Sequence, residues 1–230
     1  MKVRIKFSKQ GVMKFIGHLD IMRYFQKAIR RAKIPIVFTE GFSPHMIMSF
    51  ASPLGVGLTS SGEYMDIEVS TEIPSEEAVR RLNAVMVDGI QVLSYRRIED
   101  GKAGKAMSLV AAADYTLGFR SGHEPAQEWK NRIDAFMAQS SINILKKTKK
   151  SEKEVDIKPM IYEMRMADND RVFMQLAAGS AANLKPELVM EAFANYLGIT
   201  LTEFALEINR EELYAEGMVS LEDLGEEIGA

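Results

Sequence analysis

The sequence has no cysteine, one tryptophan and only seven prolines in 230 residues. The absence of cysteine excludes disulfides, thiolate catalysis, Cys-ligated zinc and any iron–sulfur cluster held by this chain. No run of about 18 apolar residues is present, so we expect no segment that crosses a bilayer. The N-terminal residues alternate between charged and apolar instead of forming the apolar core of a signal peptide. We therefore expect a cytoplasmic protein.

The composition is that of an ordinary globular protein, because 47% of the residues are hydrophobic and 27% are charged. At roughly 100–150 residues per domain, this length favours two small domains.

The net charge of −3 hides a strong asymmetry along the chain. Residues 1–38 hold ten Lys or Arg and one acid, Asp20, whereas residues 159–230 hold four basic residues and fourteen acids. A second basic cluster lies in the stretch KKTKKSEK, which begins at Lys146. This pattern indicates one end that faces a polyanion and another that faces solvent or a protein.

The N-terminal half has the periodicity of a β-α-β-β-α-β unit. Residues 2–8 alternate as a half-buried strand, and residues 18–32 have helical spacing with Leu19, Phe25 and Ile29 on the apolar face. A Gly-rich and Pro-rich stretch with two strands, a helix starting near Pro74 and a strand over 90–98 complete a ferredoxin-like domain over 1–99.

The same pattern recurs after a polar segment, 100–106, that is typical of a linker. We expect a second ferredoxin-like domain over 107–215 and an acidic tail over 216–230. The predicted fold class is therefore α+β, with two tandem ferredoxin-like domains.

Three ordered motifs resemble the radical-SAM-linked domain family of uncharacterised function. They are Phe15–Arg23 (FIGHLDIMR), Gly41–Pro44 (GFSP) and Pro53–Asp66, the first with one residue more than the usual spacing between its Phe and His. A later segment, 153–159 (KEVDIKP), also resembles that family. The resemblance implies a separate radical SAM protein as partner, which would carry the iron–sulfur cluster and S-adenosylmethionine. It implies no cofactor bound by this chain and gives no catalytic residue.

A looser, architectural likeness is to CRISPR-type RNA-processing endonucleases, some of which use a histidine as general base. His18 and Asp20 at the start of the first predicted helix, and His45 in the following turn, are the candidate catalytic residues. Each has a plain structural alternative as a capping or turn residue, and His123 is expected to be structural. No histidine spacing typical of a metal site is present, so we predict no metal.

The glycines at 55, 57 and 62 could offer backbone N–H groups to a phosphate, or could simply connect two strands. Glu63 and Asp66 follow them, and we expect these carboxylates to pair with Arg23 or Arg30. The candidates for nucleic-acid contact are Lys6, Arg23, Lys27, Arg30, Arg31, Lys146, Lys147, Lys149, Lys150 and Lys153. Such contact would be mainly to phosphate and strongly salt-dependent.

Three functions remain open at this point. The first is an auxiliary module that works with a radical SAM enzyme and presents an RNA or ribosome-related substrate. The second is a metal-independent RNA endonuclease that uses His18 or His45. The third is a protein–protein adaptor that docks through its acidic C-terminus.

Overall fold

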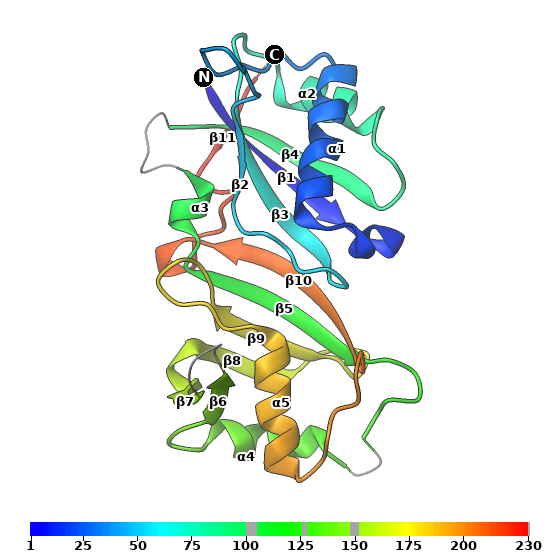
Figure 1. The fold of residues 1–230 in the computed structure, drawn as a ribbon, viewed down its shortest axis with the longest axis vertical. Coiled ribbons are helices and arrows are strands. Elements are labelled where there is room, and N and C mark those ends of the chain that lie inside the picture. The colour runs from blue at the N-terminus through cyan, green and yellow to red at the C-terminus, as the bar shows by residue number, and fades with distance from the viewer. Residues whose placement is uncertain (100–104, 126–127, 148–151, 230) are drawn as a thin grey trace. The chain divides into compact units, whose positions relative to one another are not determined.

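The computed structural model describes residues 1–99, 105–125, 128–147 and 152–229, without the side chains of 146 and 147. The chain divides into two compact units (Figure 1). Unit 1 consists of Met1–Ala111 and Arg210–Ala230, and unit 2 consists of Ala112–Asn209. Unit 1 is therefore built from two separate stretches of sequence, between which unit 2 is inserted.

Unit 1 has the predicted order of elements, β-α-β-β-α-β. Four of its strands follow the order β11-β4-β1-β3, and β2 also pairs with β3. All of these pairings are antiparallel. On its other side β3 neighbours β10, whose residues 210–214 belong to this unit. The elements are β1 (Lys2–Lys9), η1 (Gly11–Phe15), α1 (His18–Arg31), β2 (Met48–Phe50), β3 (Thr59–Glu68), α2 (Ser75–Asn83), β4 (Ile90–Ile98), α3 (Ala106–Leu109), η4 (Glu216–Met218) and β11 (Glu226–Glu227).

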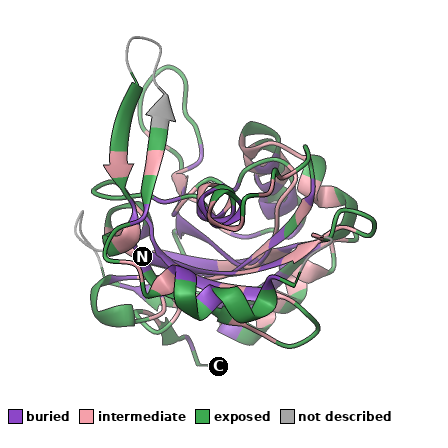
Figure 2. Cartoon of the chain, turned by 90° about the horizontal axis from the view of Figure 1, so that it is seen from below, coloured by how far each residue is buried: buried purple, intermediate pink, exposed green. Residues whose placement is uncertain are grey.

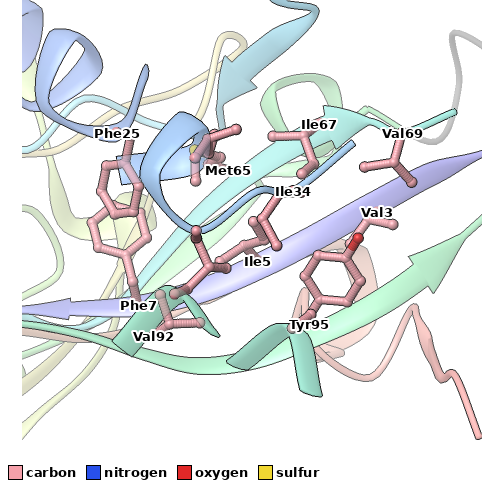
Figure 3. Close-up of a cluster of buried hydrophobic side chains, with 14 of the residues drawn as sticks. Val3, Ile5, Phe7, Phe25, Ile34, Met65, Ile67, Val69, Val92 and Tyr95 are labelled. Atoms are coloured by element: carbon pink, nitrogen blue, oxygen red, sulfur yellow. The ribbon is translucent and has the colours of Figure 1, made fainter. Parts of the chain in front are cut away.

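The core of unit 1 lies between the sheet and the two longer helices. Val3, Ile5 and Phe7 alternate along β1 and are fully buried, as predicted for this strand. Phe25 of α1 packs on Phe7, with ring centroids 4.6 Å apart (Figure 3). Ile29 is also fully buried, so the predicted core positions at 25 and 29 are confirmed.

The opposite face of this sheet is covered by the C-terminal segment. Leu221 is buried there, and Arg4 of β1 donates a hydrogen bond of 3.1 Å to its carbonyl, whereas the buried Ile228 joins the core on the helix side. The prediction of an acidic tail over 216–230 is therefore wrong, because this segment supplies β11 and part of the core of unit 1. Its acids are also engaged, since Glu222 pairs with Lys6 and Glu226 pairs with Arg97.

Unit 2 carries a three-stranded antiparallel array in the order β5-β9-β8. Its aromatic core includes Trp129, Phe136 and Phe193. A separate hairpin, β6-β7, bears the start of the second basic cluster. The elements are β5 (Ala112–Phe119), η2 (Lys130–Arg132), α4 (Ile133–Met137), β6 (Asn143–Lys147), β7 (Glu152–Asp156), η3 (Lys158–Met160), β8 (Ile161–Met166), β9 (Val172–Ala177) and α5 (Pro186–Leu197).

Strand β10 (Leu206–Tyr214) contributes its first residues to unit 2 and Arg210–Tyr214 to unit 1. The second domain thus spans 112–209 instead of 107–215. Residues 100–104 of the predicted linker lie outside the described residues, and Ala106 begins the short helix α3.

The α+β class is confirmed, and Figure 2 shows the buried residues concentrated on the strands and the inner sides of the helices. Within the described ranges, no helix has both the length and the hydrophobicity that a bilayer crossing requires.

Candidate functional site

The site is the outer surface of α1 with the elements that adjoin its N-terminal end. We call its basic part the cationic stripe and its apolar part the apolar end. The cationic stripe consists of Arg23, Lys27, Arg30 and Arg31, and the apolar end consists of Val12, Phe15, Leu19 and Val56.

The cationic stripe follows from helical geometry. Its members lie four, seven and eight residues after Arg23, which places them on one side of α1, and all four are exposed. Arg23 forms an exposed ion pair of 3.2 Å with Asp20, and Arg31 donates to the Val85 carbonyl at 2.9 Å. In the part of the chain that the structure describes, Lys27 and Arg30 have neither a hydrogen-bond nor an ion-pair partner for their side chains.

The apolar end continues the same side of the helix towards its N-terminus. Leu19 precedes Arg23 by one helical turn, so it lies in line with the stripe. The exposed fractions are 74% for Val12, 63% for Phe15, 60% for Leu19 and 62% for Val56. The prediction that Leu19 is a core residue is therefore wrong, because the inward positions of α1 are Ile21, Phe25, Ala28 and Ile29.

Backbone hydrogen bonds hold the loops of the apolar end in place. The Gly57 N–H donates to the Lys14 carbonyl at 2.8 Å and ties the 53–58 loop to η1. Gly57 has φ of 93°, which favours glycine at this turn. The ammonium of Lys14 lies 5.4 Å from the ring centroid of Phe15.

A small cavity of about 20 Å³ lies beneath the start of α1. Its lining includes His18, Lys9, Glu63 and Ser52, and the volume is enough for about one water molecule. The His18 ring packs edge-on against Phe50, with centroids 5.1 Å apart. Its nitrogens have no hydrogen-bond partner among the described residues.

Lys9 is nearly fully buried and donates to the Ile16 carbonyl at 2.8 Å. Burial lowers the pKa of Lys9 below its ordinary value of 10.5; the charge of Glu63 opposes this effect and that of Arg210 adds to it. Lys9 therefore anchors the turn before α1 and stands beside His18 at the cavity.

The two carboxylates of β3 do not pair with the helix, in contrast to the prediction. Glu63 forms a buried ion pair with Arg210, with contacts of 2.6 and 2.8 Å. Asp66 forms another with Arg4, at 2.8 and 3.1 Å, and also accepts from the Ala106 N–H. Both partners are basic residues of neighbouring strands, so the cations of α1 stay free of these carboxylates.

The predicted phosphate loop is also corrected. Gly62 lies inside β3, where an added Cβ would approach the Glu211 carbonyl oxygen to 2.5 Å. It is therefore a glycine of close strand approach, not a loop residue. The Gly57 N–H already has an acceptor, and Gly55 lies near Leu58 in the same turn. Gly55 and Gly57 therefore belong to the turn of the apolar end, and Gly62 does not.

The other two histidines each contact a threonine hydroxyl. His45 is fixed within its own turn, where its Nδ1 lies 3.1 Å from Thr39 Oγ1 and its N–H donates to the same hydroxyl. The Nδ1 of His123 in unit 2 lies 2.7 Å from Thr202 Oγ1. Asp20 pairs with Arg23 on the helix exterior.

The other basic residues that were predicted to contact nucleic acid lie in different surroundings. Lys6 forms ion pairs of 2.8 Å with both Glu212 and Glu222, so it belongs to the interior of unit 1 and not to a nucleic-acid surface. Lys153 is exposed on β7. Lys146 and Lys147 end β6, with side chains outside the described residues, and Lys149 and Lys150 lie wholly outside them.

The sequence did not lead us to predict the apolar end as an exposed surface. The signal for Leu19 was present in the spacing, since it precedes Arg23 by four residues and so continues the basic face. Phe15 had no such signal, because it lies in η1, before α1 begins. The buried partners Arg210, Glu212 and Glu222 had no such signal, because they lie more than a hundred residues from the groups they contact.

Unit 2 contains a larger cavity, of about 600 Å³, whose lining includes Phe119, Trp129, Arg171, Glu124 and Glu128. This volume is typical of a small-ligand site, but charges of both signs favour no one class of ligand. Across the described ranges, no group of three His, Asp or Glu side chains is placed to hold a metal ion.

Comparison with known proteins places the chain in a family. A search of curated proteins finds no match. One similar solved structure is a chain in the crystal structure of a Cbf5-Nop10-Gar1 complex, with 12% identity and a TM-score of 0.48. The match covers 93% of this chain but only 50% of that one, so this chain spans about half its length. Residues 2–186 match the family described as an uncharacterized protein conserved in bacteria, DUF2344, and the chain belongs to this family.

Proposed function

We propose that this chain is a cytoplasmic, auxiliary RNA-binding module that presents an RNA or ribosome-related substrate to a separate radical SAM enzyme. The RNA part rests on the cationic stripe, and the partner enzyme rests on the resemblance of Phe15–Arg23, Gly41–Pro44 and Pro53–Asp66 to the radical-SAM-linked family. The module contacts phosphates and does not itself transform the substrate.

The observation that carries the proposal is the free state of Lys27 and Arg30. Several other basic side chains of unit 1 are neutralised locally: Arg4 by Asp66, Lys6 by two glutamates, and Arg80 and Arg81 by Glu77. Exposed cations that lack carboxylate partners leave a positive potential on one side of α1. A phosphate backbone is the polyanion that such a row of charges suits best.

The test compares two sets of substitutions in the full chain. Changing Arg23, Lys27, Arg30 and Arg31 together to Gln should weaken binding to fluorescent oligouridylate at moderate salt by at least tenfold, because up to four phosphate contacts are lost. The matched control is Arg80→Gln with Arg81→Gln on α2, whose side chains already share Glu77. Equal affinities of the stripe variant and the unchanged chain would contradict RNA binding by α1.

The partner enzyme requires a separate measurement. Affinity purification of the tagged chain, followed by proteomics and RNA sequencing of the eluate, should recover a radical SAM protein together with RNA. Recovery of RNA without such a protein would remove the enzyme from the proposal and leave the RNA-binding module.

A second candidate function is metal-independent RNA cleavage through His18. The observation in its favour is the imidazole without hydrogen-bond partners beside Lys9 and Glu63, since a neutral ring nitrogen could act as general base. Cleavage of RNA in EDTA by the unchanged chain, abolished in His18→Gln and retained in His45→Gln, would establish it. Intact RNA after incubation with the unchanged chain would exclude it.

A further inference from the structure

We infer that the apolar end is a stacking platform on which an unpaired base of single-stranded RNA lies against Phe15. This inference rests on the proposed function and adds the class of RNA. Its first support is the exposed ring, because 63% of Phe15 is open to solvent.

The backbone that carries the ring is held in place by hydrogen bonds. The Ile16 N–H donates to the Met13 carbonyl at 3.0 Å, and the Ile16 carbonyl accepts from the buried Lys9. The Gly57 N–H donates to the Lys14 carbonyl, so the backbone on both sides of Phe15 is fixed. A backbone that is already ordered loses little further freedom when a base stacks on the ring, which favours binding.

The charges around the ring suit a nucleotide. Lys14 places its ammonium 5.4 Å from the ring centroid of Phe15, where it could also meet a phosphate or the face of a stacked base. Asp20 is the acidic residue of the first turn of α1, and Arg23 neutralises it. An RNA strand that covers the cationic stripe and the apolar end therefore meets cations along the RNA backbone and apolar groups at one end.

The apolar end and the cationic stripe form one path along the helix. From Leu19 to Lys27 is eight residues, or about 12 Å at 1.5 Å per residue. A flexible single strand can place phosphates along the stripe and turn a base onto Phe15. A duplex cannot, because its bases are already paired and stacked. The path therefore favours single-stranded RNA over double-stranded RNA.

The experiment uses the full chain and two probes, oligouridylate and an RNA duplex of equal length. Phe15→Ala should lower the affinity for oligouridylate roughly five- to 150-fold, the range for loss of one base–aromatic stack, with little change for the duplex. The slope of log affinity against log salt should stay unchanged, since no phosphate contact is lost. Phe15→Trp should restore affinity, and its fluorescence should fall when oligouridylate binds.

The matched control is Phe204→Ala, which removes an equally exposed phenylalanine, 77% open, from unit 2. It should leave both affinities unchanged. Unchanged affinity of Phe15→Ala for oligouridylate would overturn the stacking platform, and the apolar end would then be assigned to a protein partner. The proposed RNA function would still stand if the variant with Gln at all four positions of the cationic stripe bound oligouridylate more weakly than the unchanged chain. Failure of the stacking platform can therefore be told apart from failure of the RNA-binding function.

Discussion

Two groups of basic residues in unit 1 differ in their surroundings, because one group is buried with a carboxylate and the other faces solvent. Arg4 and Arg210 are buried, and each makes two hydrogen bonds to one carboxylate. A guanidinium suits this two-point contact, and burial without it would leave an uncompensated charge. Lys27 and Arg30 pay no such desolvation cost and keep their charge available, which is what a phosphate-binding surface requires.

Two residues of α1 differ in exposure, so their substitution by alanine should have very different effects on the free energy of unfolding. Phe25→Ala should lower the free energy of unfolding by about 3–5 kcal/mol, because it empties a fully buried position against Phe7. Leu19→Ala should change it by no more than about 0.5 kcal/mol, because that side chain is exposed. Urea unfolding measures both. A large loss for Leu19→Ala would show that this residue is packed and not part of a binding surface.

Glu222 predicts how stability changes in acid. Burial alone would raise its pKa, but the hydrogen bond from Lys6 and the charges of Lys6 and Arg96 outweigh it, so the pKa lies below its ordinary value of 4.5. The unfolded chain then binds a proton more readily than the folded one, so this stabilisation is complete above about pH 4.5 and is lost as the pH falls through the folded pKa. Glu222→Gln should reduce the loss of stability in this acid range.

The control for that titration is Glu77→Gln on α2. Glu77 also has a lowered pKa, from hydrogen bonds with Arg81 and Arg80, but it is exposed to solvent. Solvent screening weakens the contribution of Glu77 to stability, so Glu77→Gln should alter the loss of stability in acid much less. The same loss of stability in acid for Glu222→Gln and the unchanged chain would contradict the role of the Lys6–Glu222 pair.

At the scale of elements, the C-terminal segment and α1 have complementary roles. The segment covers the sheet face that carries Arg4 and Lys6, and it joins α2 through the Ser75 and Ile228 hydrogen bonds. The other sheet face packs on α1, whose outer side stays open. One basic strand is therefore covered by the chain itself, while the basic residues on the outer side of one helix stay exposed.

This arrangement predicts a large effect of truncation after Ala215. The shortened chain loses the buried side chains Leu221 and Ile228, worth about 1.5–3 kcal/mol each, and one carboxylate partner of Lys6. Its urea midpoint should fall sharply, or its cooperative transition should vanish. Glu226→Gln, which breaks only an exposed pair with Arg97, is the control. A truncated chain with the original midpoint would restore the interpretation of this segment as a tail.

Local periodicity predicted the elements of unit 1 well, because the alternation of Val3, Ile5 and Phe7 and the helical spacing of Phe25 and Ile29 depend on near neighbours. It could not predict the partners of Glu63, Asp66 or Lys6. These contacts join residues 62 to 216 positions apart, and composition gave no sign that residues 210–230 return to the first unit. The acidic composition of that segment was instead interpreted as a solvated tail.

At the scale of the whole molecule, unit 1 is discontinuous in sequence and unit 2 is inserted within it. The C-terminal stretch supplies Arg210, Glu212 and Glu222 to unit 1, so residues 1–99 alone lack three of its charge partners. The opposite charges of the two ends of the chain are thus partly explained by pairing within one unit. Among the described residues of unit 1, two side chains that keep an unpaired positive charge, Lys27 and Arg30, lie on α1.

The salt dependence of RNA binding tests this account most directly. For a single strand, each phosphate contact contributes about 0.7 to the slope of log affinity against log salt, so replacing the four residues of the cationic stripe with Gln should flatten it by roughly three units. The stability of the variant should change little, because all four side chains are exposed. A folded variant whose slope equals that of the unchanged chain would contradict the claim that α1 binds the RNA backbone.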